Sequence, residues 1–377
     1  FRSVEPVRVA LGLPRVDDAR PAAAGGLTGM LGAVVPLGGK SNRVAEAAVA
    51  GLGVAAGVVD GKGVAAVEVR AAGEGDALAQ AIDDLARAGV VAVIGPTDRD
   101  AVDAAGPRAD AAGLPLLSLS GRADKLAARK AVFHIVHSGE ARARALAARA
   151  IAKGVTRFAV LAPDSGYGKA LAAAFAAEVA RAGGTIAGTV TYKPDTKSFA
   201  GPVGKLPSGG WDAVFVPEDA GTLALIAPAL DAAGVKPRPL GTKKLRGGRP
   251  ILLLSTAENL TGAFLVDAGR HAEGALLAPG YYPDDHDAAG RAFLERFIAA
   301  YGRAPGFVEA YAYDAAQLAA AAGAGGRAGL LAALPHAQLT GLTGTIRFDA
   351  DHRRADPGVL YTVVDEGGGS FAIRVGR

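Results

Sequence analysis

The chain has 377 residues, which is long enough for two domains of ordinary size, each with its own core. Half of the residues are hydrophobic and 21% are charged, a balance typical of a globular protein, and no run of about 18 apolar residues indicates a membrane span. The absence of Cys excludes disulfides, thiolate chemistry and cysteine-ligated zinc. The net charge of +4 is dispersed along the chain, so nucleic acid is not an expected partner.

The first regular elements alternate between strand and helix. Residues 1–27 show no clear pattern. Because the chain begins at Phe1 without an initiator Met, we expect a processed or truncated product, from which any export signal would already be gone. Ser41 or Asn42 offers N-cap chemistry for an Ala-rich helix. The pattern then predicts strands at 30–37, 64–73, 90–96 and 114–120, with helices after 41, from 76 and at 100–113. Such alternation implies parallel βαβ units with helices on both faces, hence one doubly wound α/β domain.

The same alternation restarts further along the chain and predicts a second α/β lobe. Its expected strands are 157–163, 185–192, 211–218 and 250–256, with helices after 168 and at 220–234. The segment 235–250 is rich in Pro, Gly and basic residues, which predicts an exposed loop. After Gly274 we expect a strand, two helices at 287–302 and 306–322, and a strand-rich tail that completes the sheets of both lobes.

The stretch "VLAPDSGYGKALAAAF" (160–175) has a Gly-containing bend followed by Lys, as phosphate-binding loops do. A P-loop needs Gly where Pro163 stands and a hydroxyl where Ala170 stands, so we reject that interpretation. We expect Gly166 and Gly168 to let the chain turn sharply, and Lys169 to be solvated. The positions expected on the buried face of the following helix are Leu171, Phe175 and Val179, and Gly183–Gly184 is expected to end it.

Other motifs carry little chemistry. "GLGVAA" (51–56) matches a loose dinucleotide fingerprint but lies inside a predicted helix, which favours close helix packing. His134 and His137 lie in an extended segment, where residues three apart point to opposite faces, so we expect no shared metal. A Ser-His-Asp triad stays open, because its members need not be adjacent, yet no G-x-S-x-G elbow occurs. No catalytic constellation and no cofactor motif stands out.

Polar loops follow several of the predicted parallel strands. Open α/β sheets bind ligands beyond the carboxyl ends of their strands, so these loops predict a ligand site, with ordinary solvated turns as the alternative. The loops are 95–100 ("GPTDRD"), 118–122 ("SLSGR"), 163–168 ("PDSGYG"), 217–221 ("PEDAG") and 255–259 ("STAEN").

The order of these pieces resembles the type I periplasmic solute-binding proteins, especially their branched-chain amino acid group, from about Met30 to the end. The resemblance rests on "GAVVPLGGKSNRVAEAAVAGLGVA", "VVAVIGP", "AGLPLLSLS", "RFAVLAPDSGYGKALAAAF", "WDAVFVPED" and "FVEAYAYDAAQL". It implies two doubly wound parallel-sheet lobes joined by three hinge crossings, which close on a small ligand in a cleft without chemistry. The implied lobes are 1–136 plus 279–355, and 137–278 plus 356–377.

The resemblance also implies the binding residues. Loops of the first lobe would hold the ligand's carboxylate, and here they carry Thr97 and Arg99, then Ser118, Ser120 and Arg122. In the second lobe Tyr167 matches a tyrosine that packs against the ligand, and the position of the family's ammonium-binding acid falls on Ala257, with Glu258 one residue beyond. The remaining expected ligand residues, from the loops after their strands, are Glu218 and Thr256.

Because Ala257 stands where the family has its ammonium-binding acid, the class of ligand stays open. If Arg99 and Arg122 face the cleft, an acidic ligand is favoured, and if they face solvent, an apolar ligand stays open. We expect an amino acid or related small carboxylate, captured in the periplasm for a membrane ABC permease, with or without a lipid anchor on the precursor. The alternative is a branch that the same motifs also resemble, the outer-membrane lipoproteins that activate penicillin-binding proteins.

Overall fold

A computed structural model of the chain describes residues 27, 29–36, 42–58, 60–61, 63–72, 75–121, 127–242, 247–283, 288–323 and 325–376. The chain divides into two compact units. Unit 1 comprises Phe1–Ser138 and Pro283–Asp356, and unit 2 comprises Gly139–Tyr282 and Pro357–Arg377.

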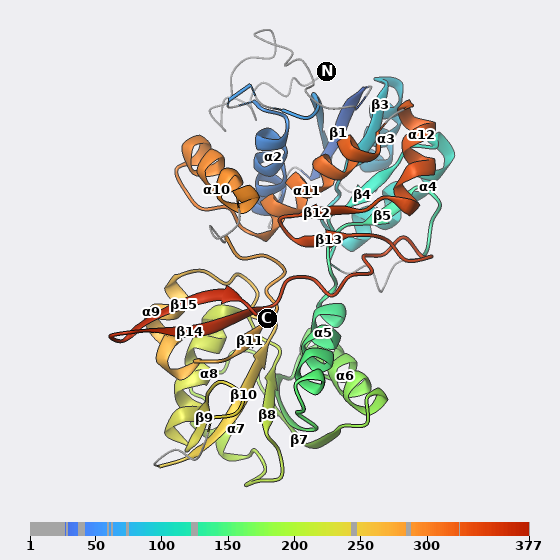
Figure 1. Cartoon of the computed structure of the whole chain (residues 1–377). Coiled ribbons are helices and arrows are strands. Elements are labelled where there is room, and N and C mark those ends of the chain that lie inside the picture. Colours follow the sequence, from blue (N-terminus) through green and yellow to red (C-terminus); the bar gives the residue numbers. More distant parts are fainter. Residues whose placement is uncertain are drawn as a thin grey trace. The chain divides into compact units, whose positions relative to one another are not determined.

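The described part of unit 1 contains a five-stranded parallel sheet with the order β2-β1-β3-β4-β5 (Figure 1). Because the chain moves outward from β1 in both directions, the sheet is doubly wound, which confirms the predicted fold class. The strands are short; β3, β4 and β5 are fully buried, as the apolar runs predicted, whereas the edge strand β2 is only partly buried. They are β1 (Met30–Pro36), β2 (Val67–Ala72), β3 (Val90–Ile94), β4 (Leu116–Ser118) and β5 (Val132–His134).

Helices pack on both faces of this sheet. α3 (Asp76–Arg87) and α4 (Arg99–Ala112) bury their apolar stripes against one face, and α2 (Asn42–Ala55) and α11 (Phe307–Ala322) contribute to the core on the other. A Cβ at Gly51 would lie 2.2 Å from the carbonyl oxygen of Glu309, so α11 crosses α2 at a point that only glycine allows. This confirms that "GLGVAA" serves helix packing.

The second segment of unit 1 begins at Pro283, where the chain comes back from unit 2. It consists of α10 (Ala288–Tyr301), α12 (Gly326–Ala333) and a hairpin of β12 (Leu339–Gly341) and β13 (Gly344–Ile346). The hairpin is a separate two-stranded sheet, so the expectation that this segment completes the main sheet was wrong except for a single bridge between Arg353 and His134.

Unit 2 has a larger sheet, with the order β15-β14-β11-β10-β8-β6-β7 and β9 paired to β10. The strands β6, β7, β8, β10 and β11 are parallel, whereas β14 and β15, from the chain's end, add to β11 as an antiparallel pair (Figure 1). The tail therefore completes this sheet, as predicted. The bounds are β6 (Arg157–Pro163), β7 (Thr185–Tyr192), β8 (Ala213–Val216), β9 (Val235–Pro237), β10 (Arg249–Ser255), β11 (Leu276–Leu277), β14 (Tyr361–Gly367) and β15 (Ser370–Val375).

The predicted exposed loop at 235–250 was wrong at its beginning. Residues 235–237 form β9, which pairs in parallel with the start of β10. The Pro- and Lys-containing sequence hides a strand of only three residues, too short to show a periodic pattern. Residues 243–246 of this segment lie outside the described residues.

The helices of unit 2 cover both faces of its sheet. α5 (Gly139–Ala152) and α6 (Gly166–Arg181) build one core, in which Leu171, Phe175 and Val179 are buried as predicted. The ring of Phe175 stacks on Phe215 of β8, with centroids 4.2 Å apart. The other core is formed with α7 (Ala200–Gly204), α8 (Ala220–Ala232), α9 (Ala263–Ala268) and the short 3-10 turn η3 (Gly269–His271).

Candidate functional site

Three strand-to-helix turns hold the predicted site loops in place through side-chain caps. Asp98, Ser165 and Asp219 each accept a hydrogen bond from a backbone N–H in the first turn of the following helix, at 2.8, 3.0 and 3.0 Å. These caps satisfy orphan donors at the helix N-termini and fix the direction in which each loop leaves its strand. The carboxyl-end loops are therefore ordered features of the fold.

The turn into α6 presents Tyr167 at the surface of unit 2. A Cβ at Gly168 would lie 2.3 Å from the carbonyl oxygen of Pro163, so this turn requires glycine, whereas a Cβ at Gly166 would meet open space. Of the two glycines expected to let the chain turn, the contacts therefore require glycine at 168 and not at 166. Lys169 forms an ion pair with Asp164 at 2.6 Å and has a 66% exposed side chain, consistent with the solvated role predicted for it.

Tyr167 belongs to a polar cluster at the carboxyl end of the unit 2 sheet, which we call the Tyr167 cluster: Arg142, Tyr167, Thr256 and Glu258. The hydroxyl of Tyr167 donates to Oε1 of Glu258. The same oxygen accepts from Arg142 Nη2 at 2.8 Å, and Thr256 Oγ1 donates to Oε2 at 3.0 Å. Burial is the largest cause that raises the pKa of Tyr167, so the phenol is a neutral donor.

Arg142 ties this cluster to the sheet. Its Nη1 donates to the carbonyl oxygens of Ala278 and Thr256, at 2.8 and 3.4 Å, and its side chain is 11% exposed. It therefore connects the start of α5 with the loops that follow β10 and β11. Sequence reasoning missed Arg142, because it is one of several arginines in an Ala- and Arg-rich helix and its partner Glu258 is 116 residues away.

The backbone around Glu258 is unusual. Ala257 and Asn259, on either side of Glu258, have positive φ angles of 44° and 58°. The N–H of Ala257 donates to Ser255 Oγ at 3.1 Å, and the carbonyl of Glu258 accepts from the N–H of Ala220 at 2.8 Å. Non-glycine residues in the left-handed region store strain and are concentrated at ligand sites and switch regions. The loop after β10 is thus bound to the start of α8, close to Glu218.

Glu218 forms a second polar contact at this edge of the sheet. Its Oε1 accepts from the hydroxyl of Tyr192 at 2.6 Å. Burial is the largest cause that raises the pKa of Glu218, and the charges of Asp219 and Glu258 raise it further. Hydrogen bonds from the Tyr192 hydroxyl and from the backbone of Asp219 oppose the rise. Of the expected ligand residues, the structure therefore brings Tyr167, Thr256 and Glu258 into direct contact and places Glu218 on the adjoining loop.

Three of the expected residues of unit 1, Thr97, Ser118 and Ser120, lie at the ends of β3 and β4, in two segments that contact each other. The N–H of Leu119 donates to the carbonyl of Pro96 at 3.0 Å, which places the loop carrying Thr97 beside Ser118 and Ser120. Both serines are buried, and Ser118 Oγ accepts from the N–H of Ser120 at 3.2 Å. Ser118 is the last residue of β4, and Ser120 lies two residues beyond it.

Of the two arginines expected to bind the ligand in unit 1, Arg99 lies within the described residues and Arg122 does not. Arg99 is in the first turn of α4, where its Nη2 forms an ion pair with Asp100 at 2.6 Å and 44% of its side chain is exposed. Arg122 lies outside the described residues.

The two histidines of the H-x-x-H motif have structural contacts in unit 1. His137 is buried between the hydroxyl of Tyr311, 2.8 Å from Nδ1, and Asp356, 2.9 Å from Nε2. Asp356 also accepts from Arg354 Nε at 2.6 Å. His134 ends β5 and is buried. Within the described ranges no group of three or more His, Asp or Glu residues could hold a metal ion, and no single helix is long and apolar enough to cross a bilayer.

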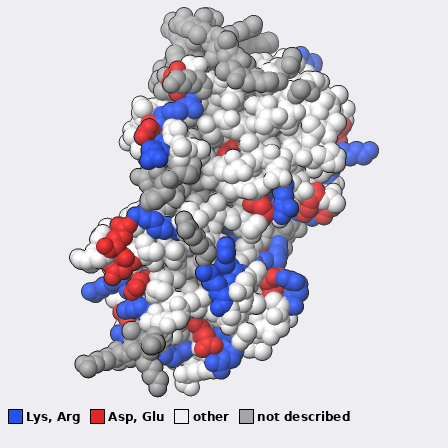
Figure 2. Space-filling model, viewed as in Figure 1, with Lys and Arg blue, Asp and Glu red and all other residues white. Residues whose placement is uncertain are grey.

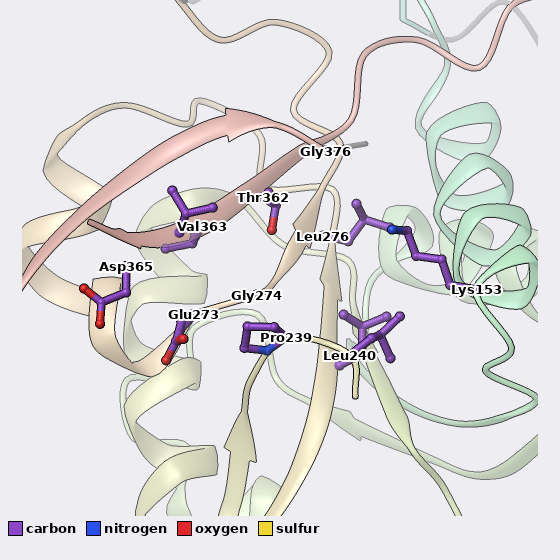
Figure 3. Close-up of a pocket in the computed structure, with 12 residues that line it drawn as sticks. Lys153, Pro239, Leu240, Glu273, Gly274, Leu276, Thr362, Val363, Asp365 and Gly376 are labelled. Carbon is purple, nitrogen blue, oxygen red and sulfur yellow. The ribbon is translucent and has the colours of Figure 1, made fainter. Parts of the chain in front are cut away.

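A separate hollow of about 480 Å³ lies elsewhere in unit 2 (Figure 3). It is lined by Glu273 and Gly274 before β11 and by Thr362 and Asp365 of β14, with Lys153 pointing in from the end of α5. It is therefore at the amino end of β11, away from the loops that carry the Tyr167 cluster. Figure 2 shows basic and acidic side chains interspersed on the visible face, without a large patch of one sign.

Comparison with known proteins gives a family match and a set of similar folds. The sequence profile described as "Periplasmic binding protein" matches residues 22–369. None of the curated proteins compared with the chain matches it. Among solved structures, a branched-chain amino acid ABC transporter periplasmic ligand-binding protein from Burkholderia xenovorans has a TM-score of 0.68 at 19% identity, covering 93% of this chain and 95% of that one.

Two further structures were solved with ligands. The branched-chain amino acid substrate-binding protein LivJ from Streptococcus pneumoniae, in complex with isoleucine, has a TM-score of 0.59 at 23% identity, covering 92% of this chain and 99% of its own. A solute-binding protein from R. palustris, in complex with benzoate, has a TM-score of 0.61 at 20% identity, covering 91% and 94%. At these identities the similarity shows the fold, and it agrees with the α/β architecture described above.

Proposed function

The chain belongs to the periplasmic binding protein family, and from this premise we propose that it captures a small carboxylate-bearing ligand, such as an amino acid, for a membrane ABC permease. We propose an extracytoplasmic location and a binding role without catalysis. The isoleucine and benzoate bound by two structures of the same fold are both small carboxylates, which supports this ligand class.

The observation that carries the proposal is the polar edge of the unit 2 sheet. Beyond the carboxyl ends of β6, β8 and β10, where open α/β sheets bind ligands, the chain places Tyr167, Glu218, Thr256 and Glu258. Tyr167 is 41% exposed although it is a large aromatic residue held by hydrogen bonds on its hydroxyl. An ordered, exposed aromatic ring beside polar groups is suited to pack against a ligand.

The loops of unit 1 supply a second set of proposed contacts. Thr97, Ser118 and Ser120 carry hydroxyls that suit a carboxylate, and we propose them as its donors; Thr97 is the strongest candidate, because it is partly exposed whereas both serines are buried in unit 1. Arg99 and Arg122 stay proposed ligand residues, although the existing ion pair of Arg99 with Asp100 makes it the weaker candidate. We propose capture by hinge motion at the points where the chain passes between the units, after Ser138, Tyr282 and Asp356.

Thermal unfolding in the presence of candidate ligands tests the proposal. A panel of proteinogenic L-amino acids and small mono- and dicarboxylates is added to the purified protein, and the unfolding temperature is measured by the fluorescence of Trp211 and by circular dichroism. A ligand that binds only the folded state raises the unfolding temperature as its concentration increases. At least one compound is expected to do so. A protein that responds to none of them but binds a peptidoglycan synthase would instead be an interaction module.

A further inference from the structure

Glu218 and Glu258 lie at the same edge of the unit 2 sheet, but their carboxylates differ in the hydrogen bonds and ion pairs that they form within the chain. Glu258 accepts from three side chains, Tyr167, Arg142 and Thr256, which engage both of its oxygens. Its charge is matched by Arg142 within the unit. A carboxylate that accepts three hydrogen bonds and is paired with an arginine would be stabilised little by a further positive group.

Glu218 is in the opposite situation. Its carboxylate accepts from the hydroxyl of Tyr192 and from the backbone N–H of Asp219, both of them neutral donors, and none of the ion pairs among the described residues includes Glu218. The charged groups that act on it are Asp219 and Glu258, which are both negative and raise its pKa together with burial. A half-buried carboxylate among like charges is destabilised as an anion, and a cation placed beside it would relieve that cost.

The basic side chains that belong to the Tyr167 cluster and to the first turn of α6 are already engaged. Arg142 donates to two backbone carbonyls, to Glu258 and to the hydroxyl of Tyr167 at 3.5 Å, so its guanidinium is held on all of these partners. Lys169 is paired with Asp164. Beside the loops after β6 and β10, Lys169 and Arg142 are therefore already paired and are poor partners for a ligand anion. In the loop after β8, by contrast, the carboxylate of Glu218 can pair with a ligand cation.

We propose that Glu218, oriented by Tyr192, binds a protonated amine of the ligand, and that Glu258 is a positioning residue that holds Tyr167 together with Arg142. This inference rests on the proposed solute-binding function and narrows its ligand class to small amino compounds. It moves the cation-binding role from the loop after β10 to the loop after β8. Tyr167 then forms a fixed aromatic surface beside the amine site.

The test compares amino compounds with their des-amino counterparts. Proteinogenic L-amino acids and the matching unsubstituted carboxylates, for example L-leucine and 4-methylpentanoate, are titrated into the full chain by calorimetry. An amino acid is expected to bind and its des-amino counterpart is not. Glu218→Gln keeps the size of the side chain and an oxygen for Tyr192, and it should weaken binding of that amino acid about 10- to 100-fold, as expected for a lost charged hydrogen bond.

Further variants test whether the carboxylate of Glu218, and not that of Glu258, binds the amine. Tyr192→Phe keeps the carboxylate of Glu218 but removes the hydroxyl that orients it. This variant should therefore weaken binding less than Glu218→Gln does. Binding to the unaltered chain should strengthen as the pH rises, because Glu218 must lose its proton to pair with the amine, and Glu218→Gln should remove most of this pH dependence. Circular dichroism of each variant establishes that it is folded.

The outcomes also distinguish this inference from the function on which it rests. If des-amino carboxylates bind and amino acids do not, the solute-binding function stands and the role of Glu218 is overturned. The role is equally overturned if Glu258→Gln abolishes amino acid binding while Glu218→Gln binds as the unaltered chain does. If neither class of compound binds, the proposed function fails, and the inference fails with it.

Discussion

Replacement of Arg142 by Met removes the cation at the centre of the Tyr167 cluster. The side chains of Arg142 and Glu258 are 11% and 21% exposed, so the change leaves a largely buried carboxylate without its counter-charge. Breaking a fully buried pair costs about 3–5 kcal/mol. Because Glu258 keeps its donors from Tyr167 and Thr256, we expect unit 2 to lose about 2–3 kcal/mol of unfolding free energy.

Trp211 makes this loss measurable in unit 2 alone. It is the only Trp of the chain, it is 1% exposed, and it lies in a core of unit 2, so its fluorescence reports the unfolding of this unit. With a urea dependence of about 2 kcal/mol per M, Arg142→Met should lower the urea midpoint by about 1 M. The control is Arg157→Met, which breaks the ion pair of Arg157 with Asp212, whose side chains are 53% and 54% exposed. That change should cost less than about 1 kcal/mol.

A second substitution tests the electrostatic cause. Adding Glu258→Gln to Arg142→Met removes the uncompensated charge, so the double variant should regain part of the lost stability. The reasoning is refuted if Arg142→Met unfolds at the same urea concentration as Arg157→Met, or if the double variant is less stable than Arg142→Met.

Three further predictions concern single residues. Tyr167→Ala should leave the far-UV circular dichroism unchanged and lower the urea midpoint by less than Arg142→Met does, because Glu258 loses one hydrogen-bond donor but keeps Arg142; calorimetry should show at least tenfold weaker ligand binding, and equal affinity would remove Tyr167 from the site. Gly168→Ala should lower the Trp211 urea midpoint, by about 1–3 kcal/mol, because its Cβ meets a backbone carbonyl, whereas Gly166→Ala should not; equal midpoints would contradict the packing described. Burial alone would raise the pKa of Asp356, but hydrogen bonds and charges from its neighbours lower it. The stability that Asp356 contributes is therefore present at neutral pH and lost as the pH falls through its lowered pKa, and Asp356→Asn should flatten the acid side of a calorimetric stability profile; a profile of unchanged slope would speak against this.

Much of the fold could be predicted because its signals are local. The apolar runs of β1, β3, β6 and β10 are each contained within a few residues, and the structure has these strands where the sequence indicated them. The strand β9 was missed because three residues, one of them Pro, carry no periodicity. The hairpin of β12 and β13 was assigned to the wrong sheet because a short strand does not specify its partner.

The contacts of the candidate site could not be predicted in the same way. Glu218 meets Tyr192 across 26 residues, Arg142 meets Glu258 across 116, and the buried contact of His137 with Asp356 spans 219. Such pairs depend on the order of the strands in the sheet, which a single sequence does not state. The sequence could name polar loops at the carboxyl ends of strands, but not which of their charges would be matched within the chain.

Native mass spectrometry tests the central claim, that the chain binds one small ligand at the carboxyl-end loops, most directly. The purified chain is measured alone and with each amino acid and small carboxylate of the panel, beside Tyr167→Ala as the site variant. We expect one small molecule per chain, released when the protein is unfolded, and a clear loss of that adduct in Tyr167→Ala. A chain that takes up no compound of the panel, or an adduct that persists undiminished in Tyr167→Ala, would contradict the account.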